Sequence, residues 1–524
     1  MTNPETLFGV SAFLYVGALS IFWDRWWCWL LANVMCVAVF YSMDAQGIYS
    51  FDRIREQYSA LLALAFGGGV LSITAFFDYL LRENIVVLRG TRLRTVTQLN
   101  RLSKRKSKEF ISLGNARIPL GNDGIMIAII GETGSGKTQA IMQLSLQIQA
   151  RGERQIVFDP GADLFRYLYR DGDFILSPED ERTVDWSPYS EIRGRSDCLT
   201  LTEGIIGNRD GESASWYQNA QQLSADVIWT TYQKPESTNA DLLRAICHAP
   251  TNELSELLSD TPSARFMEPG SDKQLGSLLG IAASNFRSIG ELNPSASHRS
   301  FSIRKYCEQR HDQKNLWITY SDLTASLTAP LRRCWSRLII RTLISGVENS
   351  CKKTPRTWLI MDELPSNGSL DDLQLGAARG RKYALSVIVG LQSTSQLDEI
   401  YGHDATRSLL GNFGNILILR SPEERSAKQL AAAVGTQEIE RPVLRGNDRR
   451  EMVREMRDAV LPAEIMSLKN LNGILKISEL GWARVALQLV SRKLKPVATF
   501  RPKYSISTEP VGKTEPQPLD LDDI

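Results

Sequence analysis

Residues 125–138 read IMIAIIGETGSGKT, an apolar run that passes directly into a glycine-rich turn ending in lysine and threonine. The spacing GxxxxGK followed by Ser or Thr is complete in residues 131–138, and the amphipathic run QAIMQLSLQIQA follows in residues 139–150. A strand, this turn and a helix in this order are the context of a P-loop, in which backbone N–H groups at the start of the helix bind phosphate. The stretch therefore predicts an α/β fold with a nucleotide site after its first core strand.

The turn supplies most of the predicted cofactor contacts. Its glycines let the backbone curl so that successive N–H groups point at phosphate oxygens. Lys137 is expected to reach the β- and γ-phosphates of ATP, and the hydroxyl of Thr138 is expected to bind Mg²⁺. The predicted nucleotide-binding residues are Gly131, Glu132, Thr133, Gly134, Ser135, Gly136, Lys137 and Thr138.

A second motif, TWLIMDEL in residues 357–364, supplies the carboxylates that a P-loop needs. Its apolar run leads directly into Asp362 and Glu363. Asp362 is expected to bind Mg²⁺ through water, and Glu363 is expected to orient or polarise the attacking water. Strands often end in acids, so this pattern gains its specificity from being paired with the P-loop.

The segment RGRKYALSVIVGLQ, residues 379–392, contributes two further candidate catalytic residues. Its strand-like run ends in Gln392, whose amide is placed to sense the γ-phosphate. Arg381 stands before the run, where an exposed guanidinium can cross a subunit boundary and stabilise the transition state in a neighbour. Arg379 and Arg420 are rival candidates for this role. A solvated helix end without a catalytic role is an equal alternative for Arg381.

The order of apolar runs predicts a doubly wound α/β fold. Strand-like runs recur at residues 155–158, 316–319, 357–361, 385–391 and 415–419, and they are mostly apolar on both faces, as a sheet covered by helices requires. Asp159, after the first of these runs, is expected to cap the following turn, and a contact with the nucleotide site is the alternative. Between residues 190 and 301 the apolar residues fall at helical spacing instead. The predicted organisation is a transmembrane anchor of two or three helices in residues 1–81, a basic juxtamembrane linker in 82–109, the first part of the nucleotide-binding domain in 110–189, an all-α insertion in 190–301, the second part of the nucleotide-binding domain in 302–500 and a disordered acidic tail in 501–524.

The N-terminal region predicts a membrane anchor. Residues 57–77 carry no charge, and a helix of this length matches a hydrocarbon core of roughly 30 Å. Residues 7–23 and 26–43 are also uncharged, so both two and three spans remain open. Residues 82–108 are rich in Lys and Arg and contain one acid, Glu83, which by the positive-inside rule places this side in the cytoplasm. The basic stretch fits a contact with anionic lipid, and part of a DNA path is the alternative.

The overall composition places few limits on the partners. The chain of 524 residues has 61 Lys and Arg against 59 Asp and Glu, so any DNA contact must be local. The seven cysteines are scattered without a CxxC pair, which is typical of reduced thiols in a cytoplasmic protein. The acidic tail either solubilises the chain or docks on a basic patch of a partner protein.

Several of these segments together resemble the type IV coupling proteins, in particular the conjugation ATPases of the TraD and TrwB type. The resemblance is carried by GETGSGKT, FDPGADLF, WLIMDELP, RGRKYALSVIVGLQSTSQLDEIYG and LILRSP. It implies a RecA-like P-loop hexamer tethered to the bacterial inner membrane by N-terminal transmembrane helices, with an all-helical domain at the cytoplasmic pole. It also implies that ATP hydrolysis drives DNA through the ring, and that the ring links a relaxase–DNA complex of the relaxosome to a type IV secretion channel. The family's roles fall on Lys137, Thr138, Asp362, Glu363 and Gln392, and on Arg381.

The same motifs leave other functions open. A recruiter that delivers protein substrates to the channel, with DNA pumping secondary, shares every motif named above. A chromosome-partition or viral-packaging translocase shares the ATPase core but is disfavoured by the SQLDEIYG resemblance. A transporter is disfavoured because most of the chain has a soluble α/β pattern.

Overall fold

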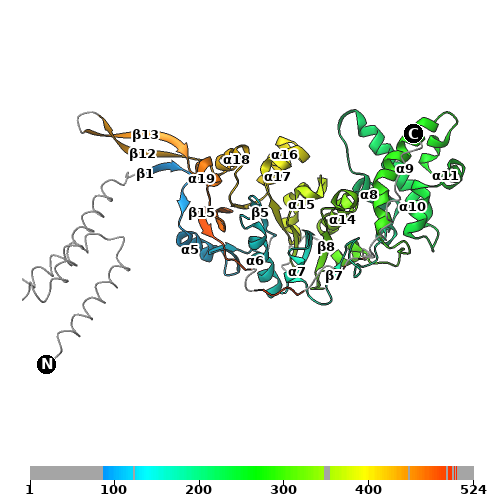
Figure 1. Cartoon of the computed structure of the whole chain (residues 1–524), viewed down its shortest axis with the longest axis horizontal. Helices are drawn as coiled ribbons and strands as arrows, with labels where there is room; N and C mark the ends of the chain where they lie inside the picture. The colour runs from blue at the N-terminus through cyan, green and yellow to red at the C-terminus, as the bar shows by residue number, and fades with distance from the viewer. Residues whose placement is uncertain are drawn as a thin grey trace, which may run out of the picture. The chain divides into compact units, whose positions relative to one another are not determined.

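The computed structural model describes residues 86–121, 124–346, 355–445, 449–490, 494–497, 501 and 503 (Figure 1). The chain divides into a small unit, which contains the described residues 86–89, 438–445 and 449–457, and a large unit, which contains the remaining described residues. The predicted membrane spans within residues 1–81 and nearly all of the predicted acidic tail lie outside the described residues. Among the helices that are described, none is both long enough and apolar enough to span a bilayer.

A ten-stranded sheet with the order β2-β15-β14-β11-β5-β10-β9-β6-β8-β7 forms the centre of the large unit. The strands from β11 to β7 run parallel, whereas β14 is antiparallel to both β11 and β15. The prediction of an α/β fold with a large, mostly parallel sheet is therefore confirmed. The strands are β2 (Leu93–Arg94), β5 (Met126–Ile130), β6 (Arg154–Pro160), β7 (Phe174–Ile175), β8 (Leu316–Tyr320), β9 (Thr357–Met361), β10 (Leu385–Leu391), β11 (Asn415–Ile418), β14 (Asn472–Ile477) and β15 (Gly481–Ala486).

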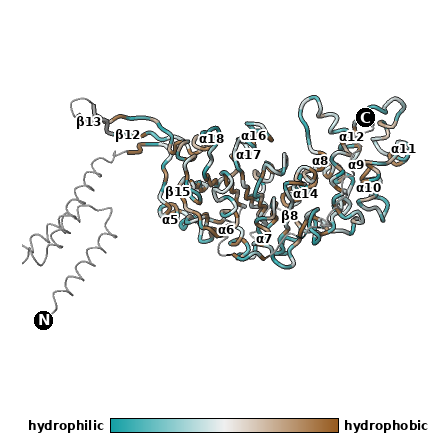
Figure 2. The backbone as a smooth tube through the Cα atoms, viewed as in Figure 1, coloured by the Kyte–Doolittle hydropathy of each residue, from teal (hydrophilic) through white to brown (hydrophobic). Residues whose placement is uncertain are grey.

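Helices cover both faces of this sheet, so its central strands are buried on both sides, and they are largely brown in the hydropathy view (Figure 2). The side chains of β5 alternate between two cores. Ile127 and Ile129 pack with α6 (Lys137–Ala150) and α7 (Phe165–Leu168). Ala128 and Ile130 belong to the core on the other face. The helices that contribute to this second core include α13 (Ile303–Glu308), α14 (Ala325–Ser345), α15 (Asp371–Arg379), α16 (Thr394–Tyr401), α17 (His403–Gly411), α18 (Glu424–Val434) and α19 (Pro462–Met466).

The regular elements between β7 and β8 in the described chain are helices, and their apolar side chains belong to the same hydrophobic core as one face of the sheet. The two ends of this helical segment lie side by side, because Trp186 pairs with Phe301 and the Phe301 N–H donates to Asp185 O at 2.8 Å. The buried Glu191 carboxylate accepts from Trp186 Nε1 at 2.9 Å and from the Ile303 N–H at 2.6 Å, which fixes the segment's exit into α13. The segment consists of α8 (Arg195–Ile206), α9 (Ala214–Tyr232), α10 (Asn239–Cys247), α11 (Thr251–Leu258) and α12 (Asp272–Phe286), together with the 3-10 helices η1 (Pro188–Glu191), η2 (Gly211–Ser213), η3 (Pro262–Met267) and η4 (Arg287–Glu291).

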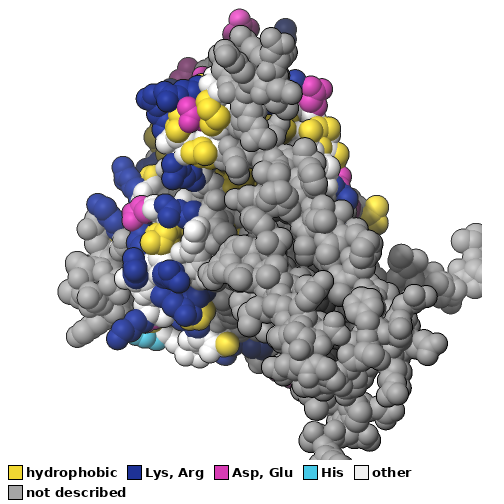
Figure 3. Space-filling model, turned by 90° about the vertical axis from the view of Figure 1, so that its left-hand side faces the viewer, with side chains coloured by type: hydrophobic (Ala, Val, Ile, Leu, Met, Phe, Trp, Pro, Cys, Tyr) yellow, Lys and Arg dark blue, Asp and Glu magenta, His cyan; other side chains and the backbone are white. Residues whose placement is uncertain are grey.

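The described part of the predicted basic linker is folded. From Val86 onward it forms β1 (Val86–Gly90), β2 and α5 (Val96–Lys106), and the buried Leu99 anchors α5 against the hairpin of β3 (Phe110–Leu113) and β4 (Ala116–Pro119). A capping box between Thr95 and Gln98 begins the helix. The last turn of α5 is basic and exposed. Lys and Arg side chains gather in a band on the described part of the face at this end of the chain (Figure 3).

The small unit contains a three-stranded sheet with the order β1-β12-β13, in which β12 (Thr436–Arg445) and β13 (Arg449–Asp458) form a long hairpin. Surface ion pairs connect the two strands, Arg454 with Glu440 at 3.1 Å and Arg441 with Glu455 at 3.0 Å. This hairpin was not predicted from the sequence.

Candidate nucleotide-binding site

The predicted P-loop connects β5 to α6 at the carboxyl edge of the parallel strands. Gly134 and Gly136 have φ values of 79° and 119°, which residues other than glycine rarely adopt. Gly131 lacks room for a side chain, because an added Cβ would lie 2.6 Å from Leu419 Cβ. The loop is anchored on both sides by the Gly131 N–H, which donates to Leu391 O at 3.0 Å, and by the Glu132 N–H, which donates to Arg420 O at 2.8 Å.

Lys137 is the first residue of α6 and is 8% exposed. Its Nζ donates to Gly131 O at 3.0 Å and lies 3.7 Å from Glu363 Oε2. The ammonium thus lies between the carbonyl at the start of the loop and the acid that follows β9. This is the position from which it can contact a phosphate that the loop binds.

Asp362 follows β9 and faces the first turn of α6, where the Thr138 hydroxyl donates to Asp362 Oδ2 at 3.4 Å. The Asp362 N–H donates to Phe158 O at 3.2 Å, so the end of β6 holds the acid in place. Its Oδ1 is buried and has no hydrogen-bond partner among the described residues. Burial raises the pKa of Asp362 to about 6, which Lys137 opposes and Glu363 reinforces. An unsatisfied buried carboxylate oxygen beside a hydroxyl fits a hard cation such as Mg²⁺.

Glu363 and Gln392 lie close together, because the side chain and the backbone N–H of Gln392 both lower the pKa of the Glu363 carboxyl. Burial raises the pKa of Glu363, and Lys137 and the Gln392 hydrogen bonds oppose the rise. The structure therefore brings together five residues that the sequence predicted from three separate motifs. These residues are Lys137, Thr138, Asp362, Glu363 and Gln392.

The three candidate arginines lie elsewhere. Arg381 is exposed in η6 (Gly380–Tyr383), before the amino end of β10, whereas Gln392 follows the carboxyl end of that strand. At about 3.3 Å per residue, β10 alone separates them by about 20 Å. Arg379 is also exposed, at the end of α15. Arg420 instead lies beside the P-loop of its own chain, where its Nε donates to the Glu132 carboxylate. Among these arginines, the structure brings Arg420 to the loop within one chain.

Asp159 is completely buried, and its carboxylate accepts from the Phe165 N–H at 2.7 Å, at the start of α7. Burial raises the pKa of Asp159 well above its usual range, and the nearby Asp362 carboxylate adds to the rise. The acid thus caps the turn that follows β6, as the sequence analysis expected.

Two further features of the site were not predicted from the sequence. A Cβ added at Gly390 would lie 2.0 Å from Asp362 O, so the approach of β10 to the acid depends on this glycine. A lone glycine inside an apolar strand was the available signal. Leu471 closes the other side of the loop, where its N–H donates to Ser135 O at 2.9 Å and its side chain lies next to Gly136. No local sequence pattern indicates that contact.

Residues 111–488 match the family model of the type IV secretion-system coupling protein DNA-binding domain. The chain belongs to this family. The resemblance inferred from the sequence motifs is therefore confirmed, and the described site is that of a coupling-protein family member.

Two curated relatives carry the same family name. The chain is 26% identical over 346 residues to the coupling protein TraD of Escherichia coli (strain K12), which covers 64% of this chain and 48% of TraD. It is 24% identical over 332 residues to the type IV secretion system-coupling protein VirD4 of Bartonella quintana (strain Toulouse), which covers 59% of this chain and 50% of VirD4. The chain thus spans about half the length of the curated relatives that it matches.

Solved structures of the bacterial conjugative coupling protein TrwB are also similar. The unbound monoclinic form of TrwBdeltaN70 has a TM-score of 0.71 at 25% identity and covers 80% of this chain and 96% of that one. TrwB in complex with ADP and Mg²⁺ has a TM-score of 0.68 at 25% identity and covers 80% of this chain and 95% of that one. The fold described here is therefore similar to that of TrwB over 80% of the chain.

Proposed function

We propose that this chain is an inner-membrane, ATP-driven DNA translocase that couples a relaxase–DNA complex to a type IV secretion channel during conjugative transfer. The observation that carries the proposal is the convergence of the P-loop, Asp362, Glu363 and Gln392 at one edge of the sheet of a coupling-protein family member. Two relatives support it by name, because TraD is a coupling protein and TrwB has been solved with ADP and Mg²⁺.

In the proposed reaction, residues 131–138 bind the phosphates of ATP, and Lys137 moves from Gly131 O to the β- and γ-phosphates. Mg²⁺ held by Thr138 and Asp362 would neutralise charge on the phosphate oxygens. Glu363 orients the attacking water and accepts its proton. Its raised pKa brings the carboxylate closer to the range in which a general base works best. Gln392 holds that carboxylate and is placed to respond to the γ-phosphate.

The finer parts of the proposal concern the assembly. Arg381 is exposed and far from the nucleotide site of its own chain, which is compatible with action on a neighbour's γ-phosphate in a homo-hexamer. Residues 57–77 would anchor the ring in the bilayer, and the basic residues of α5 would face anionic lipid. DNA, relaxosome proteins and channel proteins are the proposed partners.

The test is steady-state ATP turnover by the full-length chain in lipid nanodiscs, titrated with single- and double-stranded DNA over a salt series. A DNA motor predicts a large stimulation that weakens as salt rises, because phosphate contacts release counterions. Turnover that DNA does not change would refute the DNA motor in favour of ATP-dependent recruitment of protein substrates. The Lys137→Ala variant is the control, and it should show no turnover with or without DNA.

A further inference from the structure

Arg332, in α14, is a buried cation that is held by neutral groups. Its side chain is 1% exposed, and its hydrogen-bond acceptors in the described structure are oxygens of uncharged groups. Nε donates to Asn367 Oδ1 at 3.1 Å, and Nη2 donates to Ser366 O at 3.0 Å. The remaining bonds reach Thr328 Oγ1 at 2.5 Å and Ala325 O at 2.8 Å within the helix. A charge buried without a carboxylate partner is expensive, so its position calls for a reason beyond packing.

The guanidinium also rests on the ring of Tyr320, 3.8 Å from its centroid. Burial lowers the pKa of Arg332 to about 10, a value at which the side chain remains charged at neutral pH. The Tyr320 hydroxyl donates to Ser366 Oγ at 2.6 Å, and its oxygen also lies 3.3 Å from Asn367 Oδ1. Arg332 and Tyr320 therefore hold the same two residues from the end of β8 and from α14.

Those two residues form part of the turn that follows Glu363, η5 (Pro365–Asn367). The Ser366 hydroxyl donates to Glu363 O at 2.7 Å, and Asn367 Nδ2 donates to the same carbonyl at 3.1 Å. The main chain of Glu363 thus accepts two hydrogen bonds, and Arg332 bonds to the main chain of one donor residue and to the side-chain amide of the other. Rotation of this peptide would move the Glu363 carboxylate away from Lys137 and Gln392.

We propose that Arg332 is a positioning residue that sets the orientation of Glu363 for hydrolysis and contributes little to nucleotide binding. The inference rests on the proposed function of the site. Arg332 acts through Ser366 and Asn367, and its hydrogen bonds within the described part of the chain reach none of the nucleotide-binding residues.

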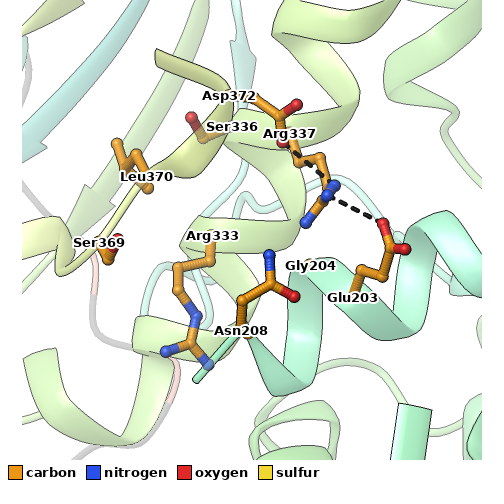
Figure 4. A pocket seen from close by; sticks show the side chains of 10 residues that line it. Glu203, Gly204, Asn208, Arg333, Ser336, Arg337, Ser369, Leu370 and Asp372 are labelled. Carbon is orange, nitrogen blue, oxygen red and sulfur yellow. Dashed lines mark ion pairs between the residues drawn. The ribbon is translucent and has the colours of Figure 1, made fainter. Parts of the chain in front are cut away.

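The α14 helix, which carries Arg332, also contacts the helical segment between β7 and β8. On the next turn of the helix, Arg337 forms ion pairs with Glu203 of α8 at 2.9 Å and with Asp372 of α15 at 3.1 Å (Figure 4). These residues line a small cavity together with Arg333 and Ser336. The same helix is thus tied to the helical segment through Arg337 and to the turn behind Glu363 through Arg332.

The test compares Arg332→Lys and Tyr320→Phe with the wild-type full-length chain. Lysine keeps the positive charge but lacks the planar set of N–H donors of the guanidinium, and phenylalanine keeps the aromatic ring but lacks the hydroxyl. For Arg332→Lys we expect kcat to fall about 10- to 100-fold, the loss typical of a catalytic group displaced by about 1 Å. For Tyr320→Phe we expect a smaller fall. The Kd for a fluorescent ATP analogue should change by less than about three-fold in both, because the loop and Lys137 are untouched.

The kcat of the double variant is expected to fall by less than the product of the two single fold-changes, because both side chains act on the same turn. Arg341→Met is the matched control, because this half-exposed arginine of the same helix pairs with Asp372 and does not contact the turn. It should turn over at the wild-type rate. Folding of each variant is checked by its thermal unfolding transition. If Arg332→Lys does not fold, the test relies on Tyr320→Phe.

Two results would overturn the inference. One is an unchanged kcat in folded variants, and the other is a parallel loss of kcat and nucleotide affinity. A wild-type chain without ATP turnover would instead refute the proposed function and the inference with it.

Discussion

Replacing Asp362 by asparagine should stabilise the nucleotide-free, metal-free protein while abolishing ATP turnover. Asp362 is 7% exposed, and its Oδ1 has no hydrogen-bond partner among the described residues. Burial raises its pKa to about 6 from an ordinary value of 3.8. The folded state therefore holds an unfavourable charge at neutral pH. Asparagine removes that charge and keeps the shape, but it also removes the proposed Mg²⁺ ligand.

The size of the effect follows from the shift in pKa. A shift of about 2 units corresponds to about 3 kcal/mol at roughly 1.4 kcal/mol per unit. Because the folded-state pKa lies above the unfolded one, the wild-type protein has no penalty below about pH 4, where the acid is protonated in both states. The penalty grows between about pH 4 and pH 6 and is complete above that range. The stability gained by the variant should follow the same curve.

Urea unfolding in nanodiscs without nucleotide or Mg²⁺, repeated from pH 4 to pH 8, measures this difference. The exposed Asp260→Asn variant is the matched control and should show no such pH dependence. An Asp362→Asn variant that is no more stable than wild type at pH 8, or whose advantage is constant across the pH range, would refute the reasoning. Either result would mean that the site relieves the buried charge in a way that the described contacts do not include.

Three further predictions concern the same site. Lys137→Ala should abolish ATP turnover and leave membrane insertion intact, as measured by phosphate release and membrane flotation; unchanged hydrolysis would overturn the site assignment. Arg381→Ala should also be inactive, and mixing it with the Lys137→Ala variant should restore part of the turnover if the arginine acts on a neighbouring subunit, whereas no rescue at any mixing ratio would count against that role. Gly390→Ala should lower the free energy of unfolding by about 1–3 kcal/mol and reduce turnover, because its methyl group would collide with Asp362 O. The control Gly276→Ala, in open space on α12, should be neutral or slightly stabilising, and equal stabilities of the two variants would contradict the argument.

The central strands could be predicted because a strand that is buried on both faces has a continuous run of apolar residues. The run at residues 385–391 coincides with β10, and the run at 125–130 contains β5. The acids and the glutamine could be predicted because each follows such a run, and parallel strands carry their final residues to one edge. Sequence alone therefore placed Asp362, Glu363 and Gln392 near the P-loop.

Elements at the rim of the sheet escaped prediction because their burial is partial. β14 and β15 are antiparallel strands that contain exposed or half-buried residues among their buried ones, and β2 spans two residues. The α5 helix was read only as a basic stretch, although Thr95 and Gln98 formed a capping signal. Long-range side-chain contacts leave no local pattern at all. Arg332 and the Arg420 contact with Glu132 depend on elements that are distant in the chain, and no spacing rule identifies them.

The position of β5 has a consequence for how the chain folds as it is synthesised. The N–H of Ile125, next to β5, bonds to Ser386 at the start of β10, 261 residues later in the chain. At about 5–20 residues per second, a ribosome needs roughly 10–50 s to make that partner. During this interval the apolar run before the P-loop lacks both neighbouring strands, since β11 follows later still. The strand that places the nucleotide loop therefore stays unpaired on the ribosome for tens of seconds, and its apolar side chains need protection from aggregation until β10 has been made.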